Sequence, residues 1–162
     1  RPRKPLIAFT PKQLLRLSAA SSHLDEFTSG AFQPVIGDDT ITDPASVTRV
    51  LLCSGRLYYD LVKEREHRGD TSTAIIRLEQ LYPLPEAEVA EVLAQYPNAS
   101  VTWVQDEPRN QGAWPHLALN LFPSLGRAVR VVSRPESATT AAGRASLHKE
   151  QAATLIVQAF EG

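Results

Sequence analysis

The sequence has little of what marks a secreted, membrane or nucleic-acid-binding protein. Its 162 residues include a single cysteine, Cys53, which excludes an internal disulfide framework and indicates a reducing compartment. No apolar run approaches the roughly 20 residues of a membrane-spanning helix, and the N-terminus lacks the layout of a signal peptide. With 17 basic and 18 acidic residues the net charge is −1, which favours neither nucleic acid nor a membrane as a partner.

Two further absences concern the chain's origin and its chemistry. The sequence contains no methionine and opens with Arg1-Pro2-Arg3-Lys4-Pro5, so we expect it to be part of a longer polypeptide. Its four histidines lie far apart, and none stands at ligand spacing from another histidine or from the cysteine, which argues against a metal centre. A Walker loop and a dinucleotide-binding fingerprint are both missing.

What is present is an alternation of strand and helix patterns. Apolar, β-branched segments predict buried strands within residues 47–53, 73–78, 101–104 and 128–132, and a short apolar run at 6–9 predicts an edge strand. Amphipathic segments between them predict helices at 56–68, 86–96 and 113–121, and Ser146 begins a closing helix. The alternation predicts an α/β fold with a mainly parallel sheet of about five strands and helices on both faces.

The regular pattern does not extend over the whole chain. Residues 1–46 are predicted as a linker, short helices and an irregular connection, because proline, glycine and aspartate interrupt the apolar spacing. Residues 47–162 are predicted as the α/β core of a single domain.

Two loops follow strands of the predicted sheet. In open α/β sheets, ligands and partners meet the fold at the carboxyl ends of strands. The main loop covers residues 106–112 and is followed by Trp114. The second loop, called the sister loop below, covers residues 53–56. Cys53 is interpreted as a core residue, and Ser54-Gly55 as a weak anion-binding turn. Glu107 is interpreted as a salt-bridge or interface residue, because it and Asp106 point opposite ways in an extended segment. Trp114 is expected to pack in the core, with packing under the loop or against a partner as the alternative.

These loops also carry a family resemblance. Residues 105–114 (QDEPRNQGAW) look like the motif near the C-terminus of the thiamine-diphosphate-dependent, decarboxylating component of 2-oxoglutarate dehydrogenase. Four other segments resemble that family in the same order: 9–16 (FTPKQLLR), 53–61 (CSGRLYYDL), 76–85 (IRLEQLYPLP) and 146–148 (SLH). The 2-oxoadipate-acting relative is the nearby alternative, although segments 110–114 and 79–81 look closer to the 2-oxoglutarate enzyme.

The resemblance implies a transketolase-type C-terminal domain of that enzyme. The whole enzyme oxidatively decarboxylates 2-oxoglutarate and passes the succinyl group to the lipoyl arm of a succinyltransferase component. Thiamine diphosphate and magnesium are then bound by the preceding domains of the chain, at a homodimer interface, and no catalytic residue is expected here. The implied role of this domain is dimer assembly and regulation, with Glu107, Asn110, Gln111 and Trp114 as loop and interface residues.

An effector site is the remaining expectation from the resemblance. Some actinobacterial members are implied to bind acetyl-CoA around segments that match 31–34 and 80–88. Gln80 matches those members, but Glu86 and Glu88 would repel the phosphate groups of acetyl-CoA, which argues against such regulation in this chain. Ser54, Arg56 and Gln80 stay as candidate effector residues. A free-standing module that binds an anion at Ser54-Gly55-Arg56 is the alternative from another class. The alanine-rich composition favours a bacterial cytoplasm over a mitochondrial matrix.

Overall fold

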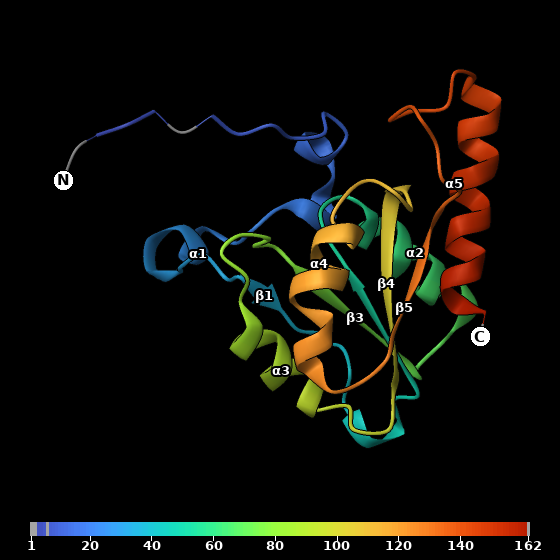
Figure 1. Cartoon of the computed structure of the whole chain (residues 1–162). Coiled ribbons are helices and arrows are strands. Elements are labelled where there is room, and N and C mark those ends of the chain that lie inside the picture. The colour runs from blue at the N-terminus through green and yellow to red at the C-terminus, as the bar shows by residue number, and fades with distance from the viewer. Residues whose placement is uncertain (1–2, 6, 162) are drawn as a thin grey trace. The chain divides into compact units, whose positions relative to one another are not determined.

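The computed structural model describes residues 3–5 and 7–161 (Figure 1). It divides into two compact units, Arg1–Phe32 and Gln33–Gly162, and each is described by itself. None of the described helices is both long and apolar enough to cross a membrane.

The larger unit is built on one five-stranded sheet. Strands β2 to β5 run parallel, and β1 pairs with β3 in the antiparallel direction. Figure 1 shows helices on either side of this sheet. The spatial order is β1-β3-β2-β4-β5, with bounds β1 Val35–Ile36, β2 Arg49–Cys53, β3 Thr73–Leu78, β4 Ser100–Pro108 and β5 Val129–Arg134. The predicted fold class is therefore confirmed.

Helices cover both faces because the apolar residues of the strands alternate between two cores. Val50 and Leu52 of β2 lie in one core with residues of α3 (Glu86–Ala94) and α4 (Trp114–Asn120). Leu51 and Cys53 lie in the other core, with residues of α2 (Leu57–Arg68) and α5 (Ala145–Phe160). A strand that is buried on both faces reads as a continuous apolar run, which is the pattern found in the sequence.

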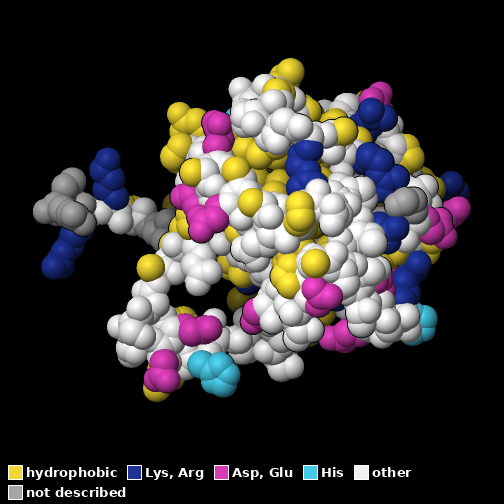
Figure 2. All heavy atoms as spheres, turned by 90° about the horizontal axis from the view of Figure 1, so that it is seen from below, with side chains coloured by type: hydrophobic (Ala, Val, Ile, Leu, Met, Phe, Trp, Pro, Cys, Tyr) yellow, Lys and Arg dark blue, Asp and Glu magenta, His cyan; other side chains and the backbone are white. Residues whose placement is uncertain are grey.

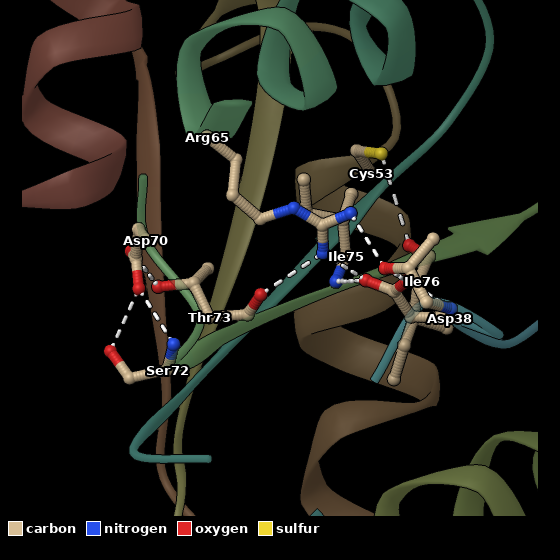
Figure 3. A network of polar contacts seen from close by, with 9 residues as sticks. Asp38, Cys53, Arg65, Asp70, Ser72, Thr73, Ile75 and Ile76 are labelled. Carbon is tan, nitrogen blue, oxygen red and sulfur yellow. Dashed lines mark hydrogen bonds and ion pairs between the residues drawn. The ribbon is translucent and has the colours of Figure 1, made fainter. Parts of the chain in front are cut away.

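A buried ion pair anchors the segment that follows β1. The Arg65 guanidinium of α2 pairs with the Asp38 carboxylate and also donates to the carbonyl oxygen of Thr73 at 3.1 Å. The same carboxylate accepts a hydrogen bond from the backbone N–H of Ile75 at 2.8 Å. Figure 3 shows these groups converging between α2 and β3. The irregular segment is thus held to the sheet by this polar network as well as by the packing of Ile41 against the core.

The described residues of the smaller unit form the 3₁₀ turns Leu14–Arg16 and Ser18–Ala20 and the helix α1 (Leu24–Ser29), and none of the residues in these elements is buried. The strand predicted at 6–9 is wrong for residues 7–9, which have no regular structure, while Leu6 lies outside the described residues. The antiparallel edge strand is instead β1, which pairs with the end of β3. A two-residue strand is too short to produce a periodic pattern in the sequence.

Candidate functional site at the carboxyl end of β4

Strand β4 carries the candidate loop at its carboxyl end. Its residues 101–105 are all buried, because the strand lies between β2 and β5 and is covered on both faces. The strand continues to Pro108, three residues beyond the predicted loop boundary, since Pro108 still pairs with Arg134 of β5. Residues 109–113 then connect β4 to α4. The loop predicted from the sequence therefore lies where it was expected, at the carboxyl ends of the parallel strands.

Gln105 organises this loop from inside. Its side-chain oxygen Oε1 accepts hydrogen bonds from Trp103 Nε1 and from the Trp114 backbone N–H, both at 2.9 Å. Its Nε2 donates to the carbonyl oxygens of Pro108 and Gln111, at 3.0 and 2.8 Å. Since Gln105 is 3% exposed, one buried amide satisfies groups at both ends of the loop.

The sequence interpretation did not single out Gln105. A usable signal was present, because an uncharged amide that ends an apolar strand must find hydrogen-bond partners for its donors and acceptors. Its position two residues after Trp103 places both side chains on the same face of the strand.

Asn110 and Gln111 tie the loop to a second loop of the same chain. Asn110 Nδ2 donates to the Ser137 carbonyl oxygen at 3.0 Å, and Asn110 Oδ1 accepts from the Ser137 N–H at 3.1 Å. Gln111 Nε2 donates to the carbonyl oxygens of Ser137 and Thr139, at 2.8 and 3.2 Å. These amides therefore connect the β4–α4 loop with the β5–α5 connection.

Glu107 and Gly112 face one another across the loop. Gly112 has a φ of +66°, and a Cβ at this position would lie 2.9 Å from the Cβ of Glu107. Only glycine fits this conformation and this contact without strain. The Glu107 side chain is exposed, and within the part of the chain that the structure describes its carboxylate has no hydrogen-bond or ion-pair partner.

Trp114 begins α4 and packs inward. Its ring centroid lies 5.7 Å from that of Phe122, which in turn is 6.3 Å from the Trp103 ring. Trp114 is half-buried against the core on this face of the sheet. The expected packing of Trp114 against the core is therefore present.

The candidate effector residues are engaged within the chain. Arg56 pairs with Asp60 at 2.9 Å and with Asp106 at 2.6 Å, which connects the sister loop to the end of β4. Gln80 Nε2 donates to the Pro83 carbonyl oxygen at 2.7 Å. Ser54 is half-buried directly after β2. The positive charge of Arg56 is therefore already shared between two carboxylates of the chain.

Cys53 is a core residue, as the sequence predicted. It is fully buried, and its thiol donates a long hydrogen bond of 3.8 Å to the Ile76 carbonyl oxygen (Figure 3). Burial, together with the nearby negative charge of Glu79, raises the pKa of the Cys53 thiol to about 12. Since the thiolate is the reactive form, this thiol is not a nucleophile at neutral pH.

The described residues offer no cluster of side chains dedicated to a metal ion. Nowhere in residues 3–5 and 7–161 are three or more His, Cys, Asp or Glu side chains grouped so that they could hold a metal ion. The Arg56 guanidinium, next to the Ser54-Gly55 turn in the sequence, is already shared between two carboxylates.

The fold and the loop define the chain as an open, mainly parallel α/β domain with its polar loops at the carboxyl edge of the sheet. Residues 21–160 match the family described as 2-oxoglutarate dehydrogenase C-terminal, and the chain belongs to that family.

Similar proteins in bacteria cover nearly all of this chain. It is 44% identical over 165 residues to a 2-oxoglutarate dehydrogenase E1 component of Azotobacter vinelandii, and 45% identical over 161 residues to one of Cupriavidus necator. It is 46% identical over 165 residues to an E1/E2 component of Corynebacterium glutamicum. Each alignment covers 98% of this chain, but only 17% of the first two relatives and 13% of the third. The chain thus spans less than a fifth of the length of these relatives.

Proposed function

We propose that this chain is the C-terminal domain of a 2-oxoglutarate dehydrogenase E1 component. The complete protein would oxidatively decarboxylate 2-oxoglutarate and pass the succinyl group to the lipoyl arm of a succinyltransferase partner. The observation that carries this proposal is alignment over 98% of the chain, at 44–46% identity, with proteins whose names specify 2-oxoglutarate. The substrate in those names also favours 2-oxoglutarate over 2-oxoadipate.

Thiamine diphosphate and magnesium belong, in this proposal, to other domains of the longer polypeptide. The support is the length of the relatives, because this chain aligns with only 17% or 13% of them and the rest of each relative lies outside the alignment. We place the complete protein in a bacterial cytoplasm, in keeping with its bacterial relatives.

The domain's own work is homodimer assembly and contact with the preceding domains. The β4–α4 loop suits this role, because Gln105 holds it rigid from below while Glu107 and Asn110 are exposed at its surface. Ser54, Arg56 and Gln80 are the candidate positions for an anionic effector. Such an effector would act by competing with Asp60 and Asp106 for the Arg56 guanidinium.

The enzymatic proposal is tested on the complete polypeptide that contains this chain. We expect a polypeptide several times longer than 162 residues. It should release carbon dioxide from 2-oxoglutarate with an artificial electron acceptor, and should depend on added thiamine diphosphate and magnesium. Pyruvate and 2-oxoadipate serve as comparison substrates. A mature protein of only 162 residues that lacks this activity would contradict the proposal. The anion-binding module would then be the function to test.

The assembly role is tested with Trp114→Ala in the complete polypeptide. Loss of the ring removes the packing of α4 against Phe122 and shifts the loop, so we expect the dimer dissociation constant to rise by about tenfold. The affinity for thiamine diphosphate should change much less. Sedimentation equilibrium and a cofactor titration measure the two quantities. Lys63→Ala, on the exposed face of α2, is the control, and an unchanged dimer in the Trp114 variant would refute the assembly role.

A further inference from the structure

Strand β5 leaves one side of the sheet open. It is the last strand in the order β1-β3-β2-β4-β5, and among the described residues it pairs with β4 alone. Its six residues, Val129–Arg134, therefore present backbone N–H and C=O groups on the outer side. Proteins usually cover such an edge, because it is a template for pairing with another extended segment.

A groove runs beside this edge. It has a volume of about 590 Å³ and lies between the end of β5 and one side of α5. Figure 1 shows the orange strand β5 and the red helix α5 next to one another. The groove-lining residues of α5 recur at intervals of three and four and so form one stripe of the helix, namely Leu147, Glu150, Gln151, Thr154, Leu155 and Gln158. Of these six only Leu155 is fully buried, so the stripe is open to a further partner.

The shape and the chemistry of the groove suit an extended peptide. A free strand edge on one side and a helix stripe on the other is the arrangement in which a peptide adds a strand to a sheet. Six residues at about 3.3 Å each reach roughly 20 Å, enough for a strand of similar length. Leu147 provides an apolar contact, and the Arg109 guanidinium has no ion-pair partner in the described part of the chain.

The groove carries both positive and negative side chains, which argues against a partner whose charges are all of one sign. Arg109 lies at the carboxyl end of β5, where its N–H donates to the Arg134 carbonyl oxygen at 3.0 Å, and Glu136 and Glu150 line the same groove. Such a mixed and open site supports only modest affinity for a free peptide. A peptide segment that is covalently linked to the domain can still fill such a site, because the linkage gives it a high effective concentration near the groove. The relatives contain long stretches of chain that could include such a segment, since this chain covers only 17% or 13% of their length.

We propose that an extended segment of the same longer polypeptide, from outside the 162 residues, pairs with β5 and fills the groove against α5. The segment continues the sheet as a sixth strand and buries Leu147 and Thr154. This proposal rests on the proposed function only in requiring a longer polypeptide.

The test compares two neighbouring positions of α5 in the complete polypeptide. Thr154 lines the groove, whereas Ala153 is equally exposed on the same helix but lies outside the groove. The photo-reactive p-benzoylphenylalanine is introduced at either position, and crosslinked peptides are identified by mass spectrometry. In parallel, T154C and A153C are labelled with a maleimide, and native Cys53 is buried and does not interfere.

If the segment occupies the groove, position 154 crosslinks to a peptide of the same polypeptide outside these residues, and position 153 does not. T154C is then labelled at least about tenfold more slowly than A153C, because labelling requires local opening. Equal labelling rates without a specific crosslink overturn the proposal, and so does a crosslink to a different protein. Decarboxylation of 2-oxoglutarate is measured on the same samples, so an open groove in an active enzyme refutes this inference and leaves the proposed function intact.

Discussion

Substituting leucine for Gln105 is expected to lower the free energy of unfolding by about 3 kcal/mol, because two donors lose their acceptor and the Gln111 carbonyl oxygen loses its donor. The Pro108 carbonyl oxygen loses one of its two donors and keeps the Gln111 N–H. Leucine is of similar size, so the loss reflects unsatisfied polar groups rather than a cavity. Trp103 Nε1 has no route to water, since Trp103 is 1% exposed. Urea unfolding followed by tryptophan fluorescence measures the change.

A local readout separates this role from general destabilisation. Hydrogen exchange should show faster exchange at residues 109–114 in the Gln105→Leu variant, while the amides of β2 and β3 keep their relative protection. Gln95→Leu is the matched control, because Gln95 is exposed at the end of α3 and its replacement should change stability by less than about 0.5 kcal/mol. If both variants unfold at the same urea concentration, Gln105 does not organise the loop.

Replacing Arg65 with methionine is expected to destabilise the domain by about 3–5 kcal/mol, because it leaves the Asp38 carboxylate buried without its counter-ion. The Asp38 side chain is only 4% exposed, and Figure 3 shows the guanidinium reaching from α2 to this carboxylate and to the Thr73 carbonyl oxygen. Combining Arg65→Met with Asp38→Asn removes the unpaired charge and should recover a large part of the loss. A double variant no more stable than Arg65→Met would mean that the ion pair is not the cause.

The dependence of stability on pH gives an independent measurement of this pair. Burial alone would raise the pKa of Asp38, but hydrogen bonds from Thr40, Ile75 and Arg65, with the Arg65 charge, hold it below its ordinary value of 3.8. A folded pKa below the unfolded one gives stability that is present above about pH 4 and is lost as pH falls through the folded pKa. In Arg65→Met the pKa of Asp38 rises, so acid unfolding should begin at a higher pH than in the wild type.

The main elements were predictable because each carries a local pattern. Strand β3 is a buried run in which only Arg77 is half-exposed. Helix α2 ends at Arg68 and is followed by Gly69, whose φ of +61° suits glycine. The position of the candidate loop followed from the apolar strand before it and the turn residues within it. The family resemblance drawn from the same residues agrees with the family match over 21–160.

The partners of the polar side chains could not be predicted in the same way. Nothing near Asn110 in the sequence indicates Ser137 as its partner, 27 residues away, and nothing near Asp38 indicates Arg65. The antiparallel strand β1 was missed because two residues carry no period, and it exists only through its pairing with β3.

By itself, the sequence determined the parallel α/β fold, the two-sided core and the place of the loop, because periodicity and turn chemistry are properties of neighbouring residues. Only the tertiary structure decided that Gln105 holds the loop and that Asp60 and Asp106 form ion pairs with Arg56. It also decided that, among the described residues, β5 pairs on one side alone. These features depend on hydrogen bonds, ion pairs and strand order between distant segments, which exist only once the chain has folded.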